Sequence, residues 1–113
     1  MLRTSIKFLL SVALVLSLTP SVLRADDPPL ALNYQNGRFE PNSLPVPANK
    51  AFKIAVTNHG STAIEFESFE LHRERVVAPG ETITVFIPAL APGNYNFFDD
   101  FHHDAPQGVI VAK

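Results

Sequence analysis

Residues 78–98 read APGETITVFIPALAPGNYNFF, two strand-like runs that each follow an Ala-Pro-Gly triplet. In the first run Ile83, Val85 and Ile87 occupy alternate positions. Alternation of β-branched and aromatic residues with polar ones predicts half-buried strands. Each triplet predicts a turn, because Pro presets its own φ and Gly tolerates positive φ.

The same alternation extends outward from this stretch. Residues 51–57 alternate apolar with more polar positions, residues 108–111 end the chain in Val-rich sequence, and Asn36-Gly37 is typical of a hairpin turn. Short strands at this spacing predict an all-β domain, a sandwich or a barrel. The expected core is Phe52, Ile54, Val56, Phe66, Ile83, Val85, Tyr95, Phe97, Val109 and Val111.

The segment 64–77 (IEFESFELHRERVV) allows two interpretations. It could form a helix, or two strands joined near Ser68; strand-like flanks favour the strands. A strand with Phe66 facing inward would place Glu65 and Glu67 on its opposite face.

The N-terminus predicts export. Arg3 and Lys7 precede an uncharged apolar run, residues 8–18, and a more polar stretch that ends at Ala25. This order is typical of a secretory signal peptide. The alternative, an uncleaved membrane anchor, is disfavoured because a spanning helix needs about 20 apolar residues. The predicted organisation is a signal peptide over residues 1–25 and one domain over residues 26–113, located in the periplasm.

The charge balance narrows the function classes. Without residues 1–25 the chain keeps six basic and eleven acidic residues, a net charge of −5 with neutral histidines. Such a composition disfavours nucleic acid as a partner. The chain contains no cysteine, which excludes disulfides, thiolate nucleophiles and thiolate metal ligands. Phosphate loops and nucleophile elbows are also absent from the sequence, so an enzyme is disfavoured.

Possible metal ligands are densest in residues 99–104 (DDFHHD), three aspartates and two histidines. Carboxylates and imidazoles together suit divalent iron, copper or zinc. The alternative is a solvated acidic loop. A second acidic group, Glu65, Glu67, Glu70, His72 and Glu74, is more simply explained by solvent exposure, and His59 by a turn.

Residues 38–113 resemble a cupredoxin-like domain. The resemblance rests on FEPNSLPVPANKAFKIAVTNHG, EFES, VVAPGETITVFIPALAPGNYNFFDDFH and the closing QGVIVAK. EFES and FFDDFH are most similar to the EfeO-type cupredoxin-like group associated with bacterial iron uptake. The resemblance implies a Greek-key β-sandwich.

The sequence departs from blue-copper proteins at the metal ligands, which in that family are two His, one Cys and a weak axial Met. The resemblance places Asp99 at the Cys position and Pro106 at the Met position, while His102 keeps its His. The first His is expected near residues 63–65, where none occurs. Without a thiolate we expect neither the intense blue colour nor blue-copper electron transfer.

The resemblance implies a metal-binding accessory to a high-affinity iron permease. The expected cofactor is a divalent metal ion, copper or iron, and assistance to iron(II) oxidation is one role consistent with this setting. The expected ligands are Glu65, Asp99, His102 and His103, followed by Glu67 and Asp100. Two alternatives stay open: a metal-free adaptor module, and a copper carrier, against which the absence of Met after residue 1 counts.

Overall fold

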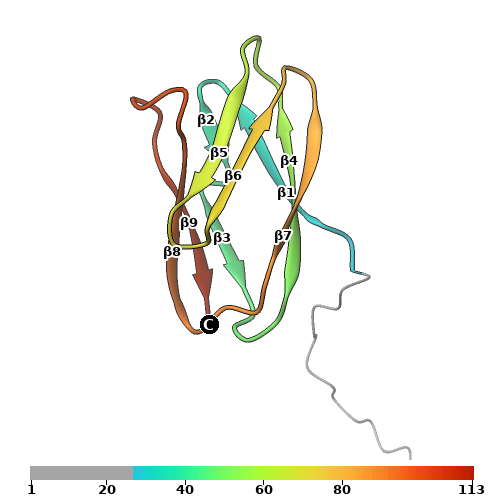
Figure 1. Cartoon of the computed structure of the whole chain (residues 1–113), viewed down its shortest axis with the longest axis vertical. Coiled ribbons are helices and arrows are strands. Elements are labelled where there is room, and N and C mark those ends of the chain that lie inside the picture. Colours follow the sequence, from blue (N-terminus) through green and yellow to red (C-terminus); the bar gives the residue numbers. More distant parts are fainter. Residues whose placement is uncertain (1–26) are drawn as a thin grey trace, which may run out of the picture.

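The alternating runs form strands of two facing sheets (Figure 1). The structure is a computed structural model that describes residues 27–113; the predicted signal peptide lies outside these residues. The nine strands of the described part are β1 (Leu30–Gln35), β2 (Arg38–Glu40), β3 (Ser43–Val46), β4 (Phe52–Asn58), β5 (Ile64–Ser68), β6 (Arg73–Val77), β7 (Thr82–Ile87), β8 (Gly93–Asp99) and β9 (Gly108–Ala112).

One sheet has the strand order β2-β1-β4-β7 and the other β3-β9-β8-β5-β6. The pairs β1–β4 and β3–β9 are parallel, and the other pairs are antiparallel. The prediction of an all-β sandwich is confirmed. Among residues 27–113, no helix has the length and apolar character to cross a membrane.

The core lies between the sheets and centres on three phenylalanines. The ring of Phe97 lies 5.2 Å from that of Phe39 and 5.4 Å from that of Phe66, centroid to centroid. Six predicted core residues are confirmed as buried, namely Phe52, Ile54, Val56, Phe66, Val85 and Phe97. Ile83 and Tyr95 are partly buried and pack against this core.

The prediction was wrong for the last strand. In β9 the buried residues are Gly108, Ile110 and Ala112, whereas Val109 and Val111 are only half-buried. Gly108 lies against the Phe97 ring so closely that a Cβ there would come within 2.2 Å of Phe97 Cζ. Because Val109, Ile110 and Val111 are all apolar, their alternation has no polar positions to indicate which face turns inward.

The segment 64–77 forms two strands, as favoured, and not a helix. Strands β5 and β6 form an antiparallel hairpin around residues 69–72, with His72 at a φ of 53°. The predicted turns at Asn36-Gly37 and Pro79-Gly80 are present. The loop 100–107 lies at the end of the sandwich away from the C-terminus (Figure 1).

Candidate metal centre

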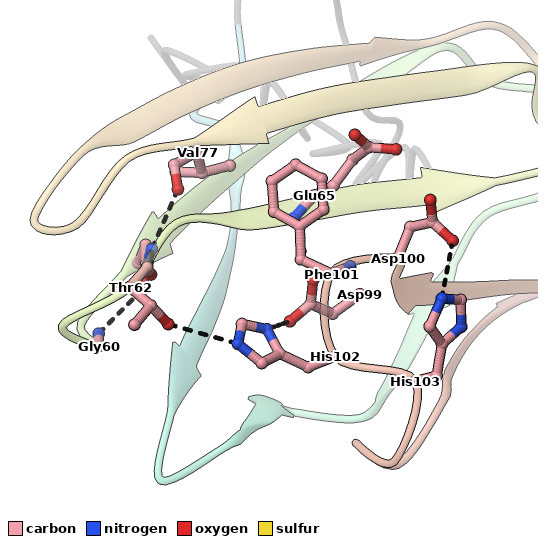
Figure 2. Close-up of polar contacts among 10 residues, drawn as sticks. Gly60, Thr62, Glu65, Val77, Asp99, Asp100, Phe101, His102 and His103 are labelled. Carbon is pink, nitrogen blue, oxygen red and sulfur yellow. Dashed lines mark hydrogen bonds and ion pairs between the residues drawn. The ribbon is translucent and has the colours of Figure 1, made fainter.

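The pairing of β5 with β8 divides the predicted ligands between two faces of one sheet. Phe66 lies opposite Asp99, and Glu67 lies opposite Phe98. Since neighbouring side chains of a strand point to opposite faces, Asp99 faces inward with Phe66, and Glu67 faces outward. Figure 2 shows the Asp99–His102 contact on one side of the β5 ribbon and the Glu65 carboxylate on the other.

On the inner side, the Asp99 carboxylate is almost completely buried and accepts three hydrogen bonds. Its Oδ1 accepts from the backbone N–H of Glu65 and of Phe101, each at 3.0 Å. Its Oδ2 contacts Nδ1 of His102 at 2.5 Å (Figure 2). Buried charge is tolerated when hydrogen-bond donors compensate it, and these donors do so for Asp99. We call Asp99 and His102 the inner pair.

The inner pair has two further neighbours, from β1 and from the loop after β4. The ring of Tyr34 stacks on that of His102 at 6.4 Å between centroids. Burial raises the pKa of Tyr34 to about 12, with contributions from Asp99 and then Asp104. Nε2 of His102 lies 3.4 Å from Oγ1 of Thr62. If Nδ1 donates to Asp99, Nε2 accepts from the Thr62 hydroxyl.

On the outer side, Glu65, Glu67 and Asp100 form a group of carboxylates, which we call the outer cluster. One oxygen from each lies within 4.8 Å of the others. Glu65 is only 7 % exposed, and its Oε1 has no hydrogen-bond partner among the described residues. Nε2 of His103 lies 3.6 Å from Oδ1 of Asp100 (Figure 2).

The outer cluster is electrostatically unfavourable when all its members are ionised. Burial raises the pKa of Glu65 to about 7, and Glu74, Glu67 and Asp100 add to the shift. Burial and then Asp100 also raise the pKa of Glu67. Desolvation and neighbouring like charges both favour the protonated form of a carboxyl group. The site therefore stabilises positive charge, whether a proton or a cation.

The structure thus does not gather the expected ligands into one set. Within residues 27–113, the outer cluster is the only group of three or more acidic, His or Cys residues with ligand atoms that close together. Asp99 and His102 stand apart from it, and Glu65 meets Asp99 through its backbone N–H. His103 contacts the outer cluster through Asp100.

The two simpler interpretations of these acidic segments are each incomplete. Asp99 is buried, so residues 99–104 are not merely a solvated loop. Glu65 is also buried, although it lies on the outer face. Tyr34 and Thr62 were not predicted as neighbours of His102, because they lie far from residue 102 along the chain and belong to no motif. His59 follows β4, with Nε2 2.9 Å from Oδ1 of Asn33.

A blue-copper centre does not fit these residues. The chain has no cysteine, and its one methionine is Met1. Asp99, which stands at the expected Cys position, directs both carboxylate oxygens to donors of the protein itself. The imidazole Nδ1 of His102 is likewise occupied by Asp99.

Several solved structures have a similar fold at low sequence identity. Auracyanin from Roseiflexus castenholzii superposes with a TM-score of 0.63 at 13% identity, covering 74% of this chain and 95% of that one. A purple cupredoxin from Nitrosopumilus maritimus gives 0.57 at 14%, covering 74% and 99%. Amicyanin from Paracoccus versutus gives 0.59 at 12%, covering 80% and 85%. At these identities the likeness shows the fold alone.

Sequence comparison finds a relative at higher identity than these solved structures. An uncharacterized protein of Rickettsia prowazekii is 39% identical over 82 residues, which are 73% of this chain and 66% of that protein. The alignment therefore spans slightly less than two thirds of that relative. The sequence model of the cupredoxin-like domain matches residues 7–112. This chain belongs to the cupredoxin-like domain family.

Proposed function

We propose that this protein binds a metal ion through the outer cluster of Glu65, Glu67 and Asp100. One observation carries the proposal: Oε1 of Glu65 is buried without a hydrogen-bond partner and belongs to a group of three converging carboxylates. Leaving a buried polar atom unpaired costs free energy, and crowding carboxylates together adds repulsion. A bound cation would relieve both effects.

The donor chemistry favours a hard cation. Carboxylate oxygens suit hard cations, whereas copper(I) prefers the soft sulfur ligands of Cys and Met. Neither Cys nor Met occurs among residues 27–113, which counts against a copper(I) carrier. Carboxylates also stabilise iron(III) over iron(II). Among the cations that carboxylates suit, the resemblance to the iron-uptake group makes iron the first candidate, with copper(II) as the second.

The biological setting is part of the same proposal. The N-terminal pattern supports export to the periplasm, and the resemblance to the EfeO-type group supports an accessory role beside a membrane iron permease. In this role the protein would hold the metal ion before the permease takes it up. The metal is then cargo, and it would reach the outer cluster from the side of Glu67 and Asp100, which are partly exposed.

Calorimetry of residues 26–113 with iron(II), iron(III) as a soluble chelate, copper(II) and zinc tests the proposal. Glu67→Gln should weaken binding of the preferred metal by at least about 10–100-fold, the loss that even a residue supporting a ligand produces. Glu81→Gln is the matched control, because Glu81 is exposed in a turn and the charge change is the same. Absence of both heat and a thermal shift with every metal would contradict the proposal.

An adaptor function is the second candidate, and exposed apolar residues favour it. Phe69 is 71 % exposed, Val76 52 % and Phe101 47 %. Val76 lies directly opposite Glu65 in the β5–β6 ladder, so one of these exposed apolar residues adjoins the outer cluster. If the protein retains no metal, and if Phe69→Ser abolishes its binding to a partner protein, the protein is such an adaptor.

A further inference from the structure

We propose that Asp99 is a positioning residue: from the inner side of the sheet it holds the backbone that carries the outer cluster. The inference rests on the proposed function only where metal affinity is measured. Asp99 therefore acts on the metal site without being one of its ligands.

Oδ1 of Asp99 accepts two hydrogen bonds from the main chain. It binds the N–H of Glu65 in β5 and the N–H of Phe101 in the loop after β8. Asp100 lies between Asp99 and Phe101 in the chain, and its own N–H donates to the carbonyl of Glu65 at 3.0 Å. A single buried oxygen thus fixes the main chain at, or next to, two of the three cluster residues.

The orientation of the Asp99 side chain is itself fixed by His102. Its Oδ2 contacts Nδ1 of His102, and the backbone N–H of His102 donates to the carbonyl of Asp99 at 3.2 Å. The His102 ring is in turn held by Tyr34 and Thr62. With its second oxygen fixed, the carboxylate cannot rotate away from the two N–H groups without breaking the contact with His102.

By the resemblance, Asp99 and His102 stand where cupredoxins place two metal ligands. Here the two side chains contact each other directly, and this contact links the end of β8 to the loop that follows it. The metal-binding chemistry is then left to the opposite face, whose carboxylates depend on the same strand end for their spacing.

Two substitutions separate positioning from ligation. Asp99→Asn keeps an oxygen for the two N–H groups, and its amide can donate to Nδ1 of His102 in the other tautomer. Asp99→Ala removes the acceptor and leaves both N–H groups without it. We expect metal affinity to fall by about 10–100-fold in Asp99→Ala and by clearly less than tenfold in Asp99→Asn. A ligand role predicts comparable losses in both.

Hydrogen exchange gives a readout that needs no metal. The amide protons of Glu65 and Phe101, followed by NMR in the metal-free protein, should exchange faster in Asp99→Ala than in Asp99→Asn. The amide of Val56, in the middle of β4, is the internal control for overall stability. Equal exchange at Glu65 and Phe101 in the two variants would overturn the inference, even if the protein binds metal.

Failure of the proposed metal binding and failure of the positioning role of Asp99 give different results. If the wild type binds no metal, the proposed function fails and the exchange rates alone decide the role of Asp99. If Asp99→Ala does not fold, Asp99→Asn decides: an affinity close to that of the wild type supports positioning. A loss as large as that of Glu67→Gln would overturn it.

Discussion

The inner pair and the outer cluster are built from neighbouring residues, yet they differ in how their charge is compensated. The Asp99 carboxylate has three donors from the protein. The Glu65 carboxylate, one register position away and therefore on the other face, has an oxygen with no partner and a raised pKa. The contrast indicates that electrostatic compensation, more than the density of acidic residues, distinguishes a structural carboxylate from a candidate ligand.

The largest expected effect is on the free energy of unfolding, and it distinguishes the inward face of β8 from its outward face. Phe97 and Phe98 are adjacent in β8, but Phe97 is completely buried and Phe98 only partly. Phe97→Ala should lower the free energy of unfolding by about 3–5 kcal/mol, the cost of emptying a large core position. Phe98→Ala should cost clearly less. Urea denaturation of both variants measures this, and equal losses would contradict the assignment of the faces.

The next largest effect is on metal affinity, and it distinguishes the outer cluster from other acidic residues. Asp100→Asn should weaken metal binding by about 10–100-fold, because Asp100 belongs to the outer cluster. Asp104→Asn makes the same charge change at an exposed loop residue outside that cluster and should leave the affinity nearly unchanged. Competition titration compares the two variants. Similar losses would mean that general negative charge, and not the cluster, attracts the metal.

A pH dependence should follow from Glu65 in the metal-free protein. Its pKa is about 7 in the folded state against an ordinary value of 4.5. Between these pH values the folded state keeps a proton that the unfolded state has released, so this group's contribution to stability declines as pH rises from 4.5 through 7. Melting temperatures at pH 5 and pH 8 should show the decline in the wild type.

The matched variant is Glu65→Gln, which cannot ionise. We expect a smaller fall in its melting temperature between pH 5 and pH 8. An unchanged pH dependence would mean that Glu65 is not the group responsible. In the metal-bound wild type the sign should reverse, because protons compete with the cation for the carboxylates and affinity should rise as pH approaches 7.

The smallest expected effect concerns the histidines. His102→Ala should reduce metal affinity less than Asp100→Asn does, since His102 acts through Asp99, and His59→Ala should not change it. Calorimetry compares the three variants. If His102→Ala removed most of the binding, the metal would lie at the inner pair, as the resemblance first implied, and the outer cluster would lose its role.

The strands were largely predictable because their local patterns contain polar positions. In β4 and β7 the alternation of residue types indicates the buried face directly. In β9 the apolar residues are continuous, and only packing of Gly108 against Phe97 decides that Ile110 faces inward. Packing between neighbouring strands, which local sequence does not record, resolves such strands.

By itself, the sequence determined the all-β class, the turns at Asn36-Gly37 and Pro79-Gly80 and the absence of a thiolate copper site, since these follow from local residue types and from composition. It also identified every acidic and His residue near both sites. Only the tertiary structure decided which of them meet: the β5–β8 register sends Asp99 inward to His102 and directs Glu65, Glu67 and Asp100 outward. The physical reason is that a strand alternates its side chains between two faces, so residues adjacent in sequence enter environments with different burial and different partners.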